Sequence, residues 1–381
     1  MRTPVAVDVS LDRRPSRPAL FVLLGLGAAA LLGALAILAN AALLSVAACA
    51  APAPERFVLT GSRVELCDLA GSVRLVAGTG DRTEVLVTRG GRDADRLRVE
   101  SKEENGRASL RVLYPGNRVV YPALGPGSHT SLGVSGDGCF GRLGRLGLTT
   151  RRVTIAGSGP GLEAWADIEV RVPPGRDLTL QLGVGQASVA DVDGKLRLNL
   201  AAAPARAERT RGQLFVDTGS GEVTLRACQG DLTVDTGSGA VRLEDLRGER
   251  LNVDTGSGAV TGARIASVGL VVDTGSGAIA LEGVRASEIR LDTGSGGVRL
   301  ALESGPNTLT VDTGSGGVDI VGPAELGATV KLESSSGRID SDYTMTLVHR
   351  ESETLEGRIG DGHGQIVVST GSGSVSLKQQ Q

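Results

Sequence analysis

Apolar and polar residues alternate in short runs along most of the chain between residues 176 and 378. In one representative unit, Leu232, Val234, Val241 and Leu243 occupy every second position of two such runs. Alternation with a period of two over a few residues is typical of a strand that buries one face. Thr-Gly-Ser-Gly separates the two runs, and this composition favours a bend. We therefore predict pairs of short strands joined by tight turns.

This unit repeats with a nearly constant period. Six copies of Asp-Thr-Gly-Ser-Gly follow one another at steps of 18, 19, 19, 19 and 20 residues. In weaker copies, Gln181 and Asn199 take the Asp position upstream, and Glu333 and then Ser369 take it downstream. The aspartates of the six full copies are Asp217, Asp235, Asp254, Asp273, Asp292 and Asp312.

A unit of this length is too small to bury its own apolar face, but copies stacked on one another bury it. The prediction is an all-β fold: a regular parallel β-solenoid over residues 176–378, in which equivalent residues form columns about 4.8 Å apart. A propeller blade requires about 40 residues, so a period of 18 to 20 residues excludes a β-propeller. An antiparallel meander, with Gly-Ser-Gly as the hairpin loop, stays open.

Two stretches depart from the regular pattern. Residues 57–175 contain several alternating runs, and VELCDLAGSVRLV resembles one more unit. We predict an irregular β-rich region that includes the first coils. Ser341–Gly364 interrupts the period and is predicted to be a coil from which a loop bulges.

Asp-Thr-Gly-Ser is also the sequence of the catalytic loop of pepsin-like aspartic proteases. Those enzymes need two carboxylates that face each other and share a proton. Six copies at a nearly fixed step place their carboxylates in a column instead, which argues against this chemistry. Strings that resemble Gly-x-Ser-x-Gly are not followed by the helix that a nucleophile elbow requires.

Two roles remain for the aspartates. An Asp followed by Thr-Gly can accept a hydrogen bond from the backbone two residues on, an Asx-turn that would fix the bend. Alternatively, stacked carboxylates repel one another, and Ca²⁺ bound between neighbours would relieve the repulsion. The structural role is favoured. A weak calcium ladder along the six aspartates is the candidate metal site, and no other cofactor is expected.

The N-terminal segment has the organisation of an export signal. Arg13, Arg14 and Arg17 precede an uncharged stretch that runs from residue 19 to residue 54. We predict a cytoplasmic segment at residues 1–18, with the residues that follow the apolar stretch on the other side of the membrane.

Residues 19–48 are the predicted membrane anchor or signal segment, since a transmembrane helix needs about 20 residues. Two alternatives stay open: a lipidated Cys49 in the lipobox-like Val-Ala-Ala-Cys, and a cleaved secretion signal. Residues 49–56 are predicted to be a linker.

Three further cysteines, Cys67, Cys139 and Cys228, lie in the exported part. Alignment of the units puts Cys228 at the inward position of Leu246, where a buried free thiol is expected. The same alignment puts Cys67 at the outward position of Glu244. A Cys67–Cys139 disulfide is therefore a candidate in an oxidising compartment, although spacing alone does not fix the pairing.

The remaining chemical groups are scattered. His129, His349 and His363 have no partner at metal-ligand spacing and are interpreted as loop residues. Trp165 precedes an alternating strand and is interpreted as local core or as a cap of the solenoid. The long Gly-rich loop Asn117–Gly147 is the candidate ligand-contacting surface. Its candidate residues are Arg118, Tyr121, Arg142 and Arg145.

Composition narrows the classes of function. A formal charge of −3, from 40 basic and 43 acidic residues, leaves no basic footprint for nucleic acid. Sugar-cleaving β-helices present aromatic and acidic residues on long loops, whereas aromatic residues are only 2% of this chain. This argues against an enzyme that acts on polysaccharide.

With these features the chain resembles the bacterial putative-adhesin family of β-strand-repeat proteins, a domain of unknown function. The resemblance rests on GSVRLVAGTGDRTEVLVTRGG, on GLEAWADIEVRVPPG, on the VDTGSGxVxL units and on GQIVVSTGSGSVSL. It covers residues 57–377. It implies a right-handed parallel β-helix, export or membrane attachment, and no catalytic residues to carry over.

We therefore expect a non-enzymatic, extracytoplasmic, membrane-tethered β-solenoid. It is expected to act as an adhesin-like or display scaffold at the cell envelope, with an envelope protein or glycan as its partner. A sensor or regulatory partner in envelope stress is the second hypothesis. An enzyme acting on envelope polysaccharide is the third.

Overall fold

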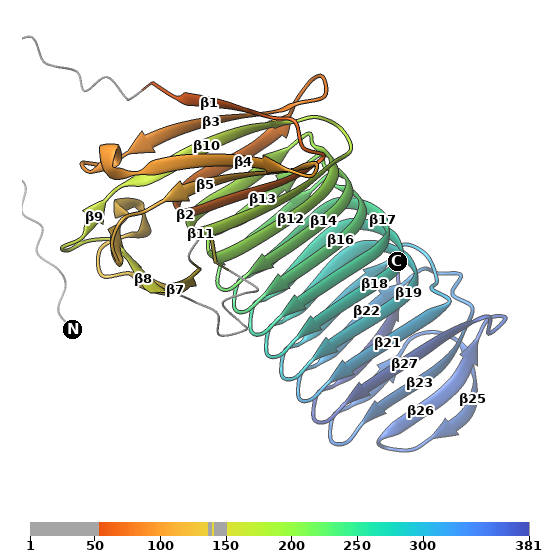
Figure 1. The fold of residues 1–381 in the computed structure, drawn as a ribbon. Coiled ribbons are helices and arrows are strands. Elements are labelled where there is room, and N and C mark those ends of the chain that lie inside the picture. The colour runs from red at the N-terminus through yellow and green to blue at the C-terminus, as the bar shows by residue number, and fades with distance from the viewer. Residues whose placement is uncertain (1–52, 136–138, 141–150, 381) are drawn as a thin grey trace, which may run out of the picture. The chain divides into compact units, whose positions relative to one another are not determined.

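The computed structural model describes residues 53–135, 139–140 and 151–380, all within one compact unit, Pro52–Gln381 (Figure 1). These residues form an all-β fold with two short 3₁₀ turns, Ala94–Arg96 and Pro122–Leu124. None of the described helical turns has the length and apolar content to cross a bilayer. The predicted anchor at residues 19–48 and the candidate lipidation site Cys49 lie outside the described residues.

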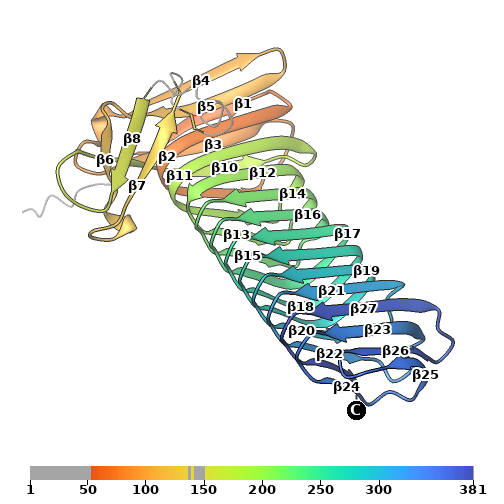
Figure 2. The same ribbon diagram turned by 90° about the horizontal axis from the view of Figure 1, so that it is seen from below.

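The regular part is a stack of coils, as predicted. Each coil contributes one strand segment before its Thr-Gly-Ser-Gly bend and one after it, and both pair in parallel with the equivalent segments of the neighbouring coils. Figure 2 shows these segments side by side. The strands are β11 (Arg176–Ala190), β12 (Asp193–Ala202), β13 (Ala205–Glu208), β14 (Arg211–Thr218), β15 (Val223–Arg226), β16 (Gln229–Thr236), β17 (Val241–Thr255), β18 (Val260–Thr274), β19 (Ile279–Thr293), β20 (Val298–Leu302), β21 (Thr308–Thr313) and β22 (Val318–Gly322).

Pairing in this stack keeps equivalent residues in columns. Val234 pairs with Val216 on one side and with Val253 on the other, and all three are buried. Because side chains alternate between the two faces, a slip of one residue would turn every apolar column toward solvent. The parallel register rules out the antiparallel meander that the sequence left open.

Antiparallel strands close the N-terminal end of the stack. The first coil, β2, lies between β11 on one side and both β5 and β10 on the other. Beyond it, β4 pairs antiparallel with β5, and β3 pairs antiparallel with β10 and β1. The strands are β1 (Glu55–Leu59), β2 (Arg63–Ala77), β3 (Thr83–Gly90), β4 (Arg98–Glu104), β5 (Arg107–Leu113) and β10 (Trp165–Val172). The irregular region thus contains a first coil, as predicted.

A second, four-stranded sheet is formed by the excursion between β5 and β10. In this excursion sheet β8 lies between β6 and β7, and β6 also pairs with β9. The strands are β6 (Arg118–Val120), β7 (His129–Val134), β8 (Arg151–Ala156) and β9 (Leu162–Glu163).

The C-terminal end departs from the predicted order of coils. β27 lies between β21 and β23 (Figure 2). β28 lies between β22 and β24. Consequently Asp312 is followed in its column by Ser369 and only then by Glu333, whereas the sequence predicted the reverse. Repeat spacing specifies which residues share a column, but it does not specify the order in which coils stack. The strands are β23 (Ala328–Ser334), β24 (Ile339–Ser341), β25 (Met345–Arg350), β26 (Thr354–Ile359), β27 (Gly364–Thr370) and β28 (Val375–Gln379).

The interpretation of Ser341–Gly364 as a bulging loop is also wrong. β25 and β26 form an antiparallel hairpin, and β26 pairs with the outer edge of β23. The hairpin ends the parallel stack. Its register shifts between Leu347 and His349 in the edge strand, an irregularity that discourages pairing with further strands.

Candidate functional site

Each bend of the stack is held by the threonine of the Asp-Thr-Gly-Ser-Gly repeat. The hydroxyl of Thr255 accepts a hydrogen bond from the N–H of Gly258 (3.0 Å) and donates one to the carbonyl of Gly239 in the preceding coil (3.3 Å). A Cβ on Gly258 would lie 1.9 Å from that carbonyl oxygen, so only glycine fits there. The same pair of bonds recurs at Thr218, Thr274, Thr293, Thr313, Ser334 and Thr370.

Five of the six aspartates do not fix the bend, which corrects the Asx-turn interpretation for them. Each Asp precedes the inward threonine by one residue and therefore points outward. Among the described residues, the carboxylates of Asp235, Asp254, Asp273, Asp292 and Asp312 accept no hydrogen bond from the turn backbone. The sequence did carry a signal for the threonine, since it is present in all six copies.

The structure places the six predicted carboxylates in one outward column. Asp217 pairs in register with Asp235, and the pairing continues coil by coil to Asp312. Burial, followed by the charges of Asp235 and Asp273, raises the pKa of Asp254. These carboxylates therefore repel one another, as the calcium hypothesis assumed. A row of exposed carboxylates is not by itself a cation site, and calcium binding stays a prediction.

Cysteine, rather than a carboxylate, occupies this column in the first coil. Cys67 pairs in register with Gln181, at the Asp position, so its alignment with Glu244 is wrong. The alignment failed because the first coil has no Thr-Gly-Ser-Gly bend to anchor it. The Cys67 sulfur is bonded to Cys139 (Sγ–Sγ 2.10 Å), the pairing that the sequence offered as a candidate. This bond ties the segment after β7 to the outer face of β2.

A carboxylate of Glu65 lies close to both sulfurs, with the three ligand-type atoms within 4.8 Å of one another. Cysteine binds metals as a thiolate. Because Cys67 and Cys139 are joined to each other, they offer no thiolate, and this cluster does not form a metal site in the oxidised protein.

A buried carboxyl group adjoins the disulfide. Asp68 is 1% exposed, and its Oδ1 accepts a hydrogen bond from the hydroxyl of Tyr114 (2.6 Å). Burial raises the pKa of Asp68 to about 8, while Tyr114 opposes the rise. Its Oδ2 has no hydrogen-bond partner among the described residues. A carboxyl held neutral in this way can act as a hydrogen-bond donor, although its burial keeps it away from any substrate.

The predicted ligand-contacting loop is largely structural. Tyr121 is 8% exposed and packs edge-to-face on Trp165, with ring centroids 5.9 Å apart. Nε of Arg118 donates a hydrogen bond to the carbonyl of Pro160 (2.7 Å). The surface role was therefore wrong for Tyr121, whereas Arg118 is exposed and its role in contacting a ligand stays a prediction. Trp165 packs against the core, as predicted. Arg142 and Arg145 lie outside the described residues.

A groove of about 800 Å³ lies on the outer face of β2, β4, β5 and β11. Two of its acidic side chains have basic partners: Glu104 with Lys102 (2.8 Å) and Asp177 with Arg63 (3.9 Å). The side chain of Arg107 has no hydrogen bond or ion pair among the described residues. An unpaired guanidinium in a concave surface can bind an anionic group. No pattern in the sequence indicated this groove, because segments distant in the chain form it.

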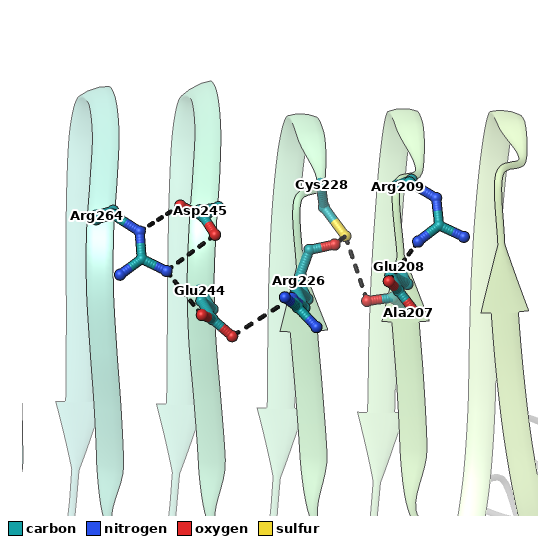
Figure 3. A network of polar contacts seen from close by, with 8 residues as sticks. All are labelled: Ala207, Glu208, Arg209, Arg226, Cys228, Glu244, Asp245 and Arg264. Carbon is teal, nitrogen blue, oxygen red and sulfur yellow. Dashed lines mark hydrogen bonds and ion pairs between the residues drawn. The ribbon is translucent and has the colours of Figure 1, made fainter.

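Charged residues also follow one corner of the stack (Figure 3). Arg264 contacts Glu244 (2.7 Å) and Asp245, and Arg226 reaches Glu244 from the other side (3.5 Å). The hydrogen bond from Arg264 holds the pKa of Asp245 below its usual value. Ion pairs this exposed contribute little to stability. The non-glycine residues with positive φ at this corner are Asp191, Arg209, Ala227, Asp245 and Arg264.

Cys228 lies just inside this corner and is a buried free thiol, as predicted (Figure 3). Its Sγ lies 3.5 Å from the carbonyl oxygen of Ala207 and 3.3 Å from that of Arg226. The interpretation of the three histidines as loop residues holds for His363 only, since His129 begins β7 and His349 belongs to β25. All three are exposed, and no metal-type cluster of the described residues includes them.

Comparison with known proteins gives one family and one solved structure. Residues 161–378, more than half of the chain, match the family model Toastrack DUF4097. A crystal structure from Clostridium sporogenes ATCC 15579, described as a "putative cell adhesion protein", aligns over 86% of this chain and 100% of its own, at 9% identity and a TM-score of 0.19. A TM-score this low supports no conclusion about fold or function. No curated protein matches. The family expected from the sequence is confirmed: the chain belongs to the Toastrack DUF4097 family, a domain of unknown function.

Proposed function

We propose that this protein is a non-enzymatic scaffold of the cell envelope that displays a regular β-solenoid surface to an envelope protein or glycan. The observation that carries the proposal is the register of the stack. From β14 to β21 the same residues recur in the same column. A threonine hydroxyl contacts the preceding coil at five of the six bends. Such a stack presents one surface pattern many times over.

The electrostatics of the column favour display over catalysis. Paired carboxylates perform acid–base chemistry when different surroundings push their pKa values apart. Here the carboxylates of neighbouring coils have nearly equivalent surroundings, since each follows an inward valine or leucine and precedes an inward threonine. The arrangement therefore suits repeated weak contacts with an extended partner.

The proposed location is outside the cytoplasm, with attachment to the membrane through the N-terminal segment. Arg13, Arg14 and Arg17 before the apolar residues 19–48 support export, either through an uncleaved anchor helix or through lipidation of Cys49. The Cys67–Cys139 disulfide supports it independently, because structural disulfides persist in oxidising compartments. The right-handed winding implied by the family resemblance is part of the same proposal.

Deletion of single coils tests the proposal that the protein acts as a scaffold. Deletion of residues 219–236, 237–255 or 275–293 removes one period and joins a threonine to the equivalent glycine of the next coil, so that the Thr-Gly sequence is preserved. We expect each shortened chain to fold and to keep binding labelled envelope fractions when immobilised. Far-UV circular dichroism checks the fold. Complete loss of binding after excision of one particular coil, in a folded chain, would indicate a local site and contradict the proposal.

The groove beside β5 favours a second candidate, a binding partner in envelope regulation. Arg107 offers a guanidinium to an anionic group of such a partner. Arg107→Glu is expected to abolish capture of that partner from envelope fractions. Arg299→Glu is the matched control, since Arg299 is also exposed but lies on β20 in the middle of the stack. Equal capture by both variants would eliminate the groove as the binding site.

A further inference from the structure

The C-terminal coil, made of β27 and β28, fills a slot between two earlier coils. One wall of this acceptor slot is β21 with β22, and the other is β23 with β24. Ile366, Val368, Val375 and Leu377 are at most 1% exposed, so the C-terminal coil completes the core between the walls. The slot is therefore a binding site for a pair of strands, filled here by residues 364–379.

The contacts in the slot are those of any two neighbouring coils. Oγ1 of Thr370 donates a hydrogen bond to the carbonyl of Gly316 in one wall (3.0 Å). Oγ of Ser334, in the other wall, donates one to the carbonyl of Gly373 in the C-terminal coil (2.8 Å). Together with the backbone ladders and the buried columns, these bonds recognise the repeat unit itself. None of them depends on which chain the unit belongs to.

The two walls also match each other. Leu309 and Val311 in β21 occupy the same columns as Val330 and Leu332 in β23, with the C-terminal coil between them. A coil that leaves the slot therefore leaves two complementary surfaces rather than a shape that only this segment can stabilise. This complementarity lowers the free-energy difference between the filled and the open slot.

A single short turn connects the C-terminal coil to the walls. β26 ends at Ile359 and β27 begins at Gly364. Within this turn Gly360 and Gly362 have φ angles of 54° and 73°, which glycine adopts without strain. Four extended residues span at most about 14 Å, compared with about 4.8 Å between coils. An opened turn thus carries the coil well clear of its own slot.

We propose that the C-terminal coil is exchangeable between copies of this protein. Residues 364–379 of one molecule fill the acceptor slot of a second copy, and the swapped coil joins the two molecules. Every ladder, apolar column and hydroxyl bond of the slot is made in the exchanged state as in the structure. The connecting turn alone changes its conformation, which is the usual requirement for domain swapping. This inference does not depend on the function proposed above.

Cysteine pairs placed across the slot test the exchange in the full chain. Thr310 and Val367 are register partners on the outer face of β21 and β27. A Thr310→Cys chain and a differently tagged Val367→Cys chain are produced together and oxidised with copper phenanthroline. A disulfide requires Cα atoms within about 7 Å. Exchange predicts a mixed dimer, in which mass spectrometry identifies a disulfide-linked peptide pair that joins the two substituted positions.

The matched control is Thr233→Cys with Asn252→Cys, register partners in the middle of the stack, where no coil can leave. We expect at least fivefold more mixed dimer from the slot pair than from this control. Equal amounts would overturn the proposal. A single chain carrying both Thr310→Cys and Val367→Cys locks the coil in its own slot, and it must abolish the mixed dimer if exchange is its source.

Discussion

The hydroxyl of Thr255 donates a hydrogen bond to the carbonyl of Gly239, one coil earlier in the stack. The same hydroxyl accepts the N–H of Gly258 within its own bend. One side chain therefore closes a turn and joins two coils. Because Thr255 is fully buried, both backbone groups depend on this hydroxyl and not on water.

Thr255→Val should destabilise the protein by about 1–3 kcal/mol, the free energy associated with a buried polar group that loses its partner. Valine has nearly the same shape as threonine but leaves the Gly258 N–H and the Gly239 carbonyl without a hydrogen bond. Chemical denaturation measures the loss in the free energy of unfolding.

Thr255→Ser is the matched control, because it keeps the hydroxyl. Ser334 shows that serine makes both bonds at the equivalent position of another coil. We expect the serine variant to lose much less stability than the valine variant. Equal losses would mean that side-chain packing, and not the hydroxyl, holds the bend.

Asp254→Asn should stabilise the protein at neutral pH. Burial and the neighbouring charges of Asp235 and Asp273 raise the pKa of Asp254, so the folded state favours the protonated form. The stability that this group contributes is complete below its unfolded pKa and is lost as the pH rises through the raised folded value. Thermal melts of both proteins from pH 3 to pH 8 should therefore converge at the acid end.

Asp292→Asn serves as the comparison for Asp254→Asn. Asp292 lies 3.5 Å from Arg290, so its removal also removes an attraction, and a smaller gain is expected. Melts run with calcium and with a chelator test the ion hypothesis on the same proteins. An unchanged midpoint for the unmodified protein would remove the calcium ladder from consideration.

Asp68→Asn should remove a dependence of stability on pH. Burial raises the pKa of Asp68 to about 8, so folding takes up a proton between about pH 4, where the unfolded group titrates, and pH 8. The stabilisation from the protonated form is complete at the acid end of this window and lost at the alkaline end. Denaturation at several pH values measures the free energy of unfolding. As the pH rises from about 4 to about 8, that of the wild type should fall relative to that of the variant, with a slope that corresponds to about one proton taken up on folding.

Tyr114→Phe separates the titration of Asp68 from its hydrogen bond. This variant removes the hydroxyl that donates to Asp68 but leaves the buried carboxyl in place. We expect lower stability at every pH, with the wild-type slope retained. A slope that disappears in Tyr114→Phe as well would show that Asp68 is not the group that titrates.

Removal of the disulfide should weaken the attachment of the excursion sheet. Cys67 and Cys139 are 72 residues apart, and closing a loop of this length contributes about 4 kcal/mol in the chain-entropy description. The double variant Cys67→Ser/Cys139→Ser should unfold at a lower denaturant concentration and be cleaved earlier by protease between residues 117 and 163. Cys228→Ala controls for loss of a thiol, and the same early cleavage in that variant would contradict the prediction.

The regular stack could be predicted because Val234, Asp235 and their equivalents recur at one period, and a period fixes columns. The order of the last coils could not be predicted. Ile366 and Val330 fit the same column equally well. What distinguishes them is the hairpin of β25 and β26, which pairs with the outer edge of β23 and so places β23 at the end of the stack. The spacing of the repeats carries no information about which coils become neighbours in the stack.

Candidate side chains were harder to place than coils. Asp254 was correctly placed in an outward column, but the role of fixing the bend belongs to Thr255, whose hydroxyl acts across coils as well as within its own bend. Cys67 was assigned to the wrong column because Asp68 stands where other coils carry threonine. Arg107 gains its significance from a groove that only the folded chain creates.

A ribosome makes β23 to β26 before it makes the coil that comes to separate them from β21. Until residues 364–379 have been made, the strands that lie between the two walls in the finished fold are missing. The stack is thus completed by insertion of the last-made coil between strands made earlier, and not by the addition of coils in sequence order. A product that stops before residue 364 would contain both walls of the acceptor slot but not the strands that fill it.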